Sequence, residues 1–147
     1  MPRIGALLLL SREHHHSLVM ARDARRAAGN GDPAIVAATV ARMESHWHTV
    51  MAAHFEREEQ LIRMAKDTLD AESVTQILFE HSELRRLASG PCELEPAARL
   101  CKFADLASAH VRYEERVFFP QLQSHSCVAA TDAEANAGVP AAPVIQP

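Results

Sequence analysis

The sequence has little of what interrupts helices or builds a disulfide scaffold. Its 147 residues include only 5 glycines and 3 cysteines, and aromatic residues make up 5% of the chain. The cysteines, Cys92, Cys101 and Cys127, are too few and too widely spaced to form a disulfide framework. We therefore expect a cytoplasmic protein whose thiols stay reduced.

The sequence also lacks a basic excess and long apolar runs. It has 15 basic and 19 acidic residues, which gives a net charge of −4. A protein that binds nucleic acid or an anionic membrane through its charge would carry a basic surplus, so we expect neither partner. No apolar run approaches the roughly 18–20 residues of a membrane span. The run 7–10 is too short for the core of a signal peptide.

In place of these features, the sequence carries helical periodicity. Apolar residues recur at spacings of three and four in four segments, which are residues 11–28, 33–65, 71–88 and 96–122. Aspartate followed by proline at 32–33 is typical of a helix start, and Ser-Gly-Pro at 89–91 is typical of a helix end. The alternation of β-branched and aromatic residues that marks strands is absent from the sequence. We therefore predict an all-α protein.

The connections between these segments predict the topology. Short connections favour neighbouring helices that run antiparallel, and an up-down four-helix bundle is the simplest architecture for four such segments. We predict this antiparallel bundle as one domain over residues 1–125. Residues 126–147 are rich in alanine and proline and have little periodicity, so we predict a low-complexity C-terminal tail.

Histidine is unusually frequent, with 9 residues in the chain. Each predicted helix has a histidine in phase with its apolar residues, and two helices add a glutamate four residues later, on the same face. These six residues are His14, His54, Glu58, His81, His110 and Glu114. One such histidine is usually a core residue bonded to backbone or water, but glutamate is almost never fully buried without a partner. The combined set therefore predicts a metal site inside the bundle.

The types of ligand narrow the choice of metal. Imidazole and carboxylate without thiolate suit iron, manganese or zinc. Six protein ligands are more than one tetrahedral zinc ion uses. Two carboxylates on opposed helices can bridge two ions, with two histidines capping each ion. We therefore predict a non-haem centre of two iron ions, with zinc or manganese as the alternative metals.

Several other side chains remain alternatives. His15 competes with His14 because Leu18 follows it at helical spacing, so a rotated first helix would exchange the two. The other histidines lie out of phase, at the edge of a face or near the tail, and we do not expect them to bind metal: His16, His46, His48 and His125.

Three further residues lie close in sequence to predicted ligands. Glu59 and Glu115 each follow a predicted ligand directly. We expect both to be solvated or to contact a ligand rather than the metal, although either is an alternative bridge. Tyr113 is a candidate hydrogen-bond donor near the site.

These residues and their order resemble the hemerythrin-like, or HHE cation-binding, domain. The resemblance covers residues 8–122 and lies in Glu13-His14, the His54–Glu58 segment HFERE, His81 with Leu84-Arg85, and the His110–Glu114 segment HVRYE. It implies an antiparallel four-helix bundle with an oxo-bridged di-iron centre. The implied ligands are the six residues predicted above, with Glu58 and Glu114 as bridges. Arg85 stands where oxygen-carrying members have a fifth histidine, which implies a more open site than theirs.

The residues and the resemblance together predict a metal-binding protein that binds or senses O2, NO or peroxide, or that handles iron. One alternative is a di-iron oxidase or an enzyme that consumes NO or peroxide, and another is a zinc-loaded or metal-free interaction bundle. Nothing in the sequence indicates a substrate path or an electron source, so we expect a binding or sensing module rather than an enzyme. The expected partner is a small diatomic ligand or peroxide, and a homo-oligomer remains open.

Overall fold

The computed structural model describes residues 5–124, so the predicted tail and His125 lie outside the described residues. Within this range all regular structure is helical, and no strand is present. The elements are α1 (Gly5–Asn30), α2 (Pro33–His46), η1 (Trp47–Met51), α3 (Ala52–Ala65), α4 (Ala71–Ala88), α5 (Pro96–Tyr113), η2 (Glu114–Phe118) and α6 (Phe119–Gln123), where η marks a π-helical turn. None of these helices is both long and apolar enough to cross a bilayer.

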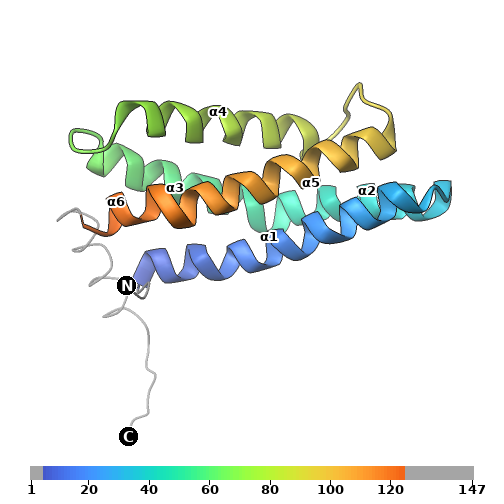
Figure 1. Ribbon diagram of the computed structural model, residues 1–147, viewed down its shortest axis with the longest axis horizontal. Coiled ribbons are helices and arrows are strands. Elements are labelled where there is room, and N and C mark those ends of the chain that lie inside the picture. Colours follow the sequence, from blue (N-terminus) through green and yellow to red (C-terminus); the bar gives the residue numbers. More distant parts are fainter. Residues whose placement is uncertain (1–4, 125–147) are drawn as a thin grey trace, which may run out of the picture.

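The helices form four long rods that lie alongside one another (Figure 1). The first rod is α1 and the third is α4, while α2 continues through η1 into α3, and α5 continues through η2 into α6. The connection from α3 to α4 lies at the end of the molecule where α1 begins, and the other two connections lie at the opposite end (Figure 1). The prediction of an all-helical chain with four helical segments is confirmed.

The helix starts follow from capping chemistry. The Asp32 carboxylate accepts the backbone N–H of Ala34 at 2.9 Å, at the start of α2. The Asp70 carboxylate accepts the N–H of Ser73 at 3.0 Å, at the start of α4. Such side chains satisfy N–H groups that have no partner within the helix, so they set where a helix begins. The predicted helix starts at residues 33 and 71 agree with the observed starts of α2 and α4.

The predicted start of the first helix at residue 11 was wrong, because α1 begins at Gly5. Leu7 and Leu10 are fully buried in an apolar cluster with residues of the other rods. Burying these two leucines requires that the helix extend through them, since helical geometry points both toward the neighbouring rods.

The π-helical turns change which residues face inward. In η2 the N–H of Phe119 bonds to the carbonyl of Glu114, five residues earlier, so the turn holds one extra residue. The regular spacing predicted Val117 in the apolar face, but Val117 is exposed and Phe118 is fully buried. The prediction was wrong here because the wider turn moves the inward position by one residue.

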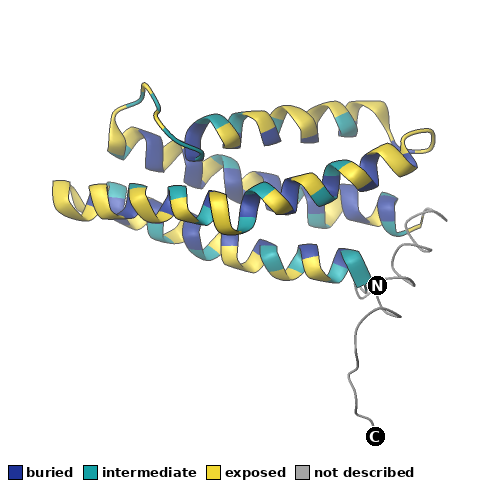
Figure 2. Cartoon of the chain, turned by 180° about the vertical axis from the view of Figure 1, so that it is seen from behind, coloured by how far each residue is buried: buried dark blue, intermediate teal, exposed yellow. Residues whose placement is uncertain are grey.

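The core consists of two apolar clusters, and the buried faces of the rods point toward each other (Figure 2). The larger cluster includes Met43, Trp47 and Phe103, and the smaller one includes Leu10 and Phe118. On each rod, the predicted metal ligands lie in sequence where the larger cluster gives way to the smaller one, although Phe55 of the larger cluster follows His54. Apolar packing on both sides therefore holds the ligand-bearing turns of the four rods at one level.

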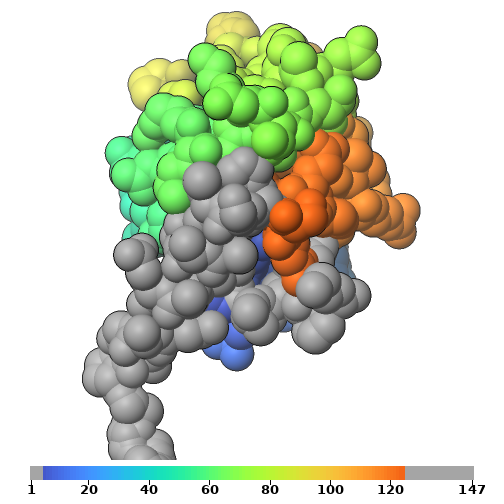
Figure 3. Space-filling model, turned by 90° about the vertical axis from the view of Figure 1, so that its left-hand side faces the viewer, coloured from blue at the N-terminus to red at the C-terminus, as the bar shows by residue number. Residues whose placement is uncertain are grey.

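The smaller cluster lies toward the end of the molecule shown in Figure 3, where atoms of the last rod pack against α4. Hydrogen bonds join these elements at this end. Gln121 accepts the backbone N–H of Asp70 at 3.2 Å, and the Tyr113 hydroxyl donates to Ser73 Oγ at 2.8 Å. Tyr113 thus ties the last rod to the start of α4, and its hydroxyl is not directed to the predicted ligands.

Candidate metal centre

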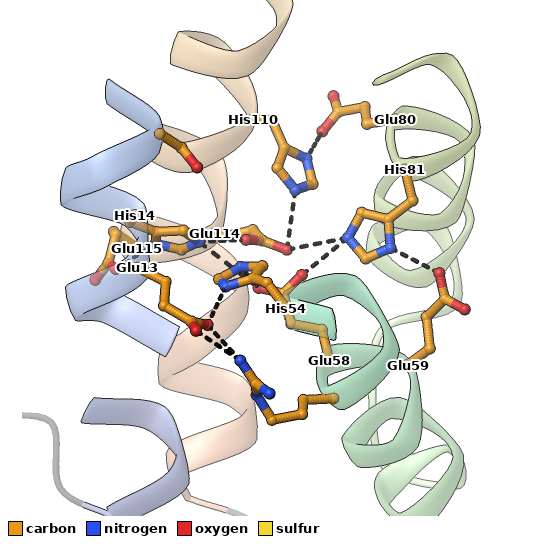
Figure 4. Close-up of polar contacts among 12 residues, drawn as sticks. Glu13, His14, His54, Glu58, Glu59, Glu80, His81, His110, Glu114 and Glu115 are labelled. Atoms are coloured by element: carbon orange, nitrogen blue, oxygen red, sulfur yellow. Dashed lines mark hydrogen bonds and ion pairs between the residues drawn. The ribbon is translucent and has the colours of Figure 1, made fainter. Parts of the chain in front are cut away.

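The structure brings the six predicted ligands together in the interior (Figure 4). Each histidine comes from a different rod, and the two glutamates lie on α3 and at the first residue of η2. All six are buried, and Glu58 and Glu114 have no exposed surface at all. The four rods thus place imidazole and carboxylate groups together in the buried interior.

These residues form two groups of possible ligands. One group adds His14 and His54 to the pair Glu58 and Glu114, and the other adds His81 and His110 to the same pair. Within each group, the candidate ligand atoms all lie within 4.8 Å of one another. Because both glutamates belong to both groups, the arrangement is compatible with two adjacent metal ions that share them.

The carboxylate oxygens divide between the two groups. In Glu58, Oε2 lies 2.8 Å from Nε2 of His54, and Oε1 lies 2.9 Å from Nε2 of His81. In Glu114, Oε1 lies 2.8 Å from Nε2 of His14, and Oε2 lies 3.2 Å from Nε2 of His110. Each glutamate therefore presents one oxygen to each group, as a bridging carboxylate does.

Four of these inward atoms have no hydrogen-bond partner. They are Nε2 of His54 and His110, and Oε2 of Glu58 and Glu114. The paired atoms lie 2.8 and 3.2 Å apart, but these contacts do not have hydrogen-bond geometry. Burying a polar atom without a partner is costly, and a cation between these atoms would satisfy all of them. This donor set therefore fits a metal site.

Each of the four histidines is held from outside by another glutamate. His14 Nδ1 lies 2.6 Å from Glu115, His54 Nδ1 2.9 Å from Glu13, His81 Nδ1 2.8 Å from Glu59, and His110 Nδ1 2.7 Å from Glu80. When Nδ1–H donates to the carboxylate, the lone pair on Nε2 faces inward. Metal-binding histidines are typically oriented in this way, with a carboxylate or carbonyl on the other ring nitrogen.

The outer glutamates form a ring around the site. They are Glu13, Glu59, Glu80 and Glu115. Each contacts a histidine on an adjacent rod. The glutamate on α1 contacts the histidine on α3, that on α3 the histidine on α4, that on α4 the histidine on α5, and that on η2 the histidine on α1. Each outer glutamate also stands directly next to a predicted ligand in the sequence. The ring therefore links the orientation of every histidine to the packing of the neighbouring rod.

Two outer glutamates were considered from the sequence and two were not. Glu59 and Glu115 contact ligand rings, as expected for residues that support a ligand rather than bind the metal. Glu13 and Glu80 were not predicted to hold histidines. The signal that was available is a glutamate adjacent to a predicted ligand on each of the four rods.

Aromatic rings complete the surroundings of the histidines. The ring of Phe55 stacks on His81 with centroids 3.8 Å apart, and the ring of Phe119 stacks on His14 at 5.2 Å. Both phenylalanines are buried. Their stacking restricts the planes of these two imidazole rings and places apolar surface beside them.

The buried charges shift the pKa of each histidine. Burial lowers the pKa of His14, but hydrogen bonds with Glu114, Glu115 and Glu58 outweigh it and raise that pKa to about 11. Burial also lowers the pKa of His81, but hydrogen bonds with Glu114 and Glu58 outweigh it and raise that pKa to about 10. The metal-free site therefore holds protons on His14 and His81 at neutral pH, and a metal ion must displace them.

The pKa values of His110 and Glu114 shift as a pair. Burial lowers the pKa of His110, but the negative charge of Glu114 and the hydrogen bond with Glu80 raise it to about 9. Burial and the charge of Glu58 raise the pKa of Glu114, but His110 and His14 outweigh them and lower it to about 2. The metal-free site thus pairs imidazolium with carboxylate. A dication would take the place of the protons and leave the carboxylates charged.

The other histidines within residues 5–124 lie outside the buried groups. His15 and His16 are exposed. His48 is also exposed, and its Nε2 lies 3.1 Å from the carbonyl of Ser89. His46 is partly buried and contacts Ser17. The structure thus places His14, and not His15, among the candidate ligands.

Separate alanine substitutions of His14 and His15 test whether His14 is the ligand on α1. We expect His14→Ala to remove most of the bound metal, because His14 Nε2 belongs to one of the two groups. His15→Ala should leave the metal content unchanged, because His15 points to solvent. Elemental analysis of both purified variants measures this. Loss of metal in His15→Ala alone would mean that α1 is rotated from its place in the structure.

Comparisons with protein-family models, with curated proteins and with solved structures each found no match to this chain. The fold and the site therefore define the class: a helical bundle with buried histidine and glutamate groups that can hold metal. The resemblance to the hemerythrin-like domain stays a prediction.

Proposed function

We propose that this chain is an antiparallel up-down four-helix bundle of the hemerythrin-like kind, which binds two iron ions in the buried site. The observation that carries the proposal is the sharing of Glu58 and Glu114, each with one oxygen toward either histidine pair. The places of the three connections at alternate ends of the molecule support the antiparallel topology.

The donor set is compatible with iron. Each group offers two imidazoles and two carboxylates, with no thiolate. Non-haem iron accepts such mixed ligands and keeps coordination positions open for a further ligand. Bound iron would supply those open positions and its redox chemistry. The protein supplies a fixed geometry through the ring of outer glutamates and the stacked phenylalanines.

The space beside the site supports a very small ligand. A cavity adjoins His14, His54 and His110 and leaves about 10 Å³ for the centre of a water-sized molecule. This is close to the minimum that one water molecule needs. Five apolar residues contribute to its wall: Met51, Phe55, Leu84, Ala107 and Val111. A cavity of this size excludes an organic substrate and leaves room only for the smallest ligands, which favours binding or sensing over oxidation of organic compounds.

Metal analysis of the purified protein tests the proposal. We expect close to two iron ions per chain after growth with ample iron, because two groups of ligands share the glutamates. Iron-loaded protein should also show charge-transfer absorption in the near ultraviolet. One tetrahedral zinc ion per chain without any uptake of iron would contradict the di-iron site and favour a zinc-loaded interaction bundle.

A further inference from the structure

A buried serine lies beside the candidate metal centre without belonging to either ligand group. Ser17 follows His14 by three residues on α1, so both side chains lie on the same helix face. Ser17 is buried, and it lines the small cavity next to the ligand histidines. Among the described residues that line this cavity, it is the only polar one apart from these histidines. Its hydroxyl is therefore the group best placed to recognise a ligand there.

A second histidine holds this serine from the outer side. Ser17 Oγ lies 2.9 Å from Nε2 of His46, the last residue of α2. His46 also lines a separate surface pocket of about 410 Å³ that includes His15, His16 and Arg42. The contact between Ser17 and His46 thus lies where a solvent-facing pocket and the inner cavity approach each other.

The protonation of His46 decides what the hydroxyl can do. Burial and the charges of His16 and His54 lower the pKa of His46 to about 4, so its ring is neutral at neutral pH. A neutral imidazole has one N–H and one acceptor nitrogen. When the N–H is on Nε2, His46 donates to Ser17 Oγ, and the serine hydrogen is free to point into the cavity.

We propose that Ser17, positioned by His46, donates a hydrogen bond to the ligand in the cavity, so that the site selects a small ligand with a hydrogen-bond-accepting end. Peroxide and other small anions belong to this class, and apolar gases do not. This inference rests on the proposed metal centre, because the metal would hold the other end of the ligand.

The apolar wall makes this single donor effective. A hydrogen bond in a low-dielectric interior is stronger than in water, and an acceptor left without a partner there loses that stabilisation in full. For a charged acceptor, we expect removal of the hydroxyl to weaken binding by about 10- to 100-fold. For a weak acceptor of similar size, we expect little change.

Titration of the iron-loaded full chain with cyanide tests this inference. Cyanide is a two-atom anion that binds metal through carbon and accepts hydrogen bonds at nitrogen. We expect Ser17→Ala to keep its iron and to bind cyanide about 10- to 100-fold more weakly than the wild type, followed by absorbance. Binding of nitric oxide, a weak acceptor, to the reduced protein should be unchanged in the same variant.

Two controls separate recognition from structure. Ser108→Ala removes another buried serine that does not line the cavity, and it should leave cyanide affinity unchanged. In the metal-free protein, the ¹⁵N chemical shift of His46 Nε2 should change in Ser17→Ala, because the hydrogen bond between them is lost. This second measurement does not depend on metal.

The outcomes distinguish this inference from the proposed function. Iron-loaded Ser17→Ala with wild-type cyanide affinity would overturn the role of Ser17 and leave the metal centre intact. Equal weakening of cyanide and nitric oxide would also overturn it, because a general distortion of the cavity would then explain the loss. A wild-type protein that takes up no iron would overturn the proposed function, and this inference with it.

Discussion

Replacement of Glu58 by glutamine is expected to reduce the metal content from about two ions per chain to one or fewer. Both oxygens of Glu58 serve the site, one toward His54 and one toward His81. Glutamine keeps the volume but replaces one oxygen with an NH₂ group that cannot bind a cation, and it removes the negative charge. The loss of a shared ligand should therefore weaken both positions, as measured by elemental analysis after dialysis.

The adjacent Glu59 provides a matched control. Its carboxylate contacts Nδ1 of His81 and is not in either ligand group. We expect Glu59→Gln to retain metal, with an affinity lower by about 10- to 100-fold, because a neutral amide still accepts the N–H but orients the ring less firmly. Equal loss of metal in the two variants would show that the bridge is assigned to the wrong residue. Circular dichroism of both variants checks that the helices persist.

Removal of metal is expected to destabilise the protein, and more strongly at pH 8 than at pH 5. At free metal about 1,000 times the dissociation constant, one bound ion stabilises the fold by about 4 kcal/mol. For a chain of this length, that corresponds to a melting temperature higher by roughly 10 °C. Metal requires neutral imidazoles, so its contribution decreases as protons compete at lower pH.

The metal-free protein should respond to pH in the opposite sense. The pKa values of His14, His81 and His110 are raised from 6.5 to about 11, 10 and 9, so their stabilisation is complete below pH 6.5 and is lost as pH rises toward those values. The pKa of Glu114 is lowered from 4.5 to about 2, so its stabilisation is present above pH 4.5 and is lost as pH falls. The metal-free protein should thus be most stable between about pH 4.5 and 6.5.

Thermal melts of metal-loaded and metal-free protein from pH 5 to pH 8 test both trends. The two melting temperatures should diverge as the pH rises. Metal binding strengthens, while the stabilisation of the metal-free protein decreases above pH 6.5, where the unfolded chain releases protons that the folded histidines still hold. His15→Ala is a suitable control because it removes an exposed histidine and leaves the buried groups unchanged. Superimposable melts over the whole range would mean that the six residues do not bind metal.

The outer glutamates connect neighbouring rods through the ligand histidines. Each histidine is fixed by a carboxylate from another rod, so a movement of one rod disturbs the ligands of its neighbour. Glu13 is itself held by Arg57, whose guanidinium donates to both of its oxygens at 2.6 and 2.8 Å. This network allows four separate helices to present one set of ligands.

The sequence by itself determined the helices and the candidate ligands. Helical periodicity and capping residues place three of the four rods closely, because both depend on neighbours within a few positions. The pairs His54 with Glu58 and His110 with Glu114 stand out because buried carboxylates at helical spacing require a partner. The antiparallel topology and the binding of iron stay predictions from that pattern.

Only the tertiary structure decided the contacts between rods. Three features depend on how far each rod is rotated about its axis and shifted along it. They are the choice of His14 over His15, the pairing of Glu13 with His54 and of Glu80 with His110, and the contact of Ser17 with His46. The π-helical turn at Glu114 moves the following residues by one position, which the regular helical period does not predict. Rotation and height result from the packing of both apolar clusters together, so no local stretch of sequence contains them.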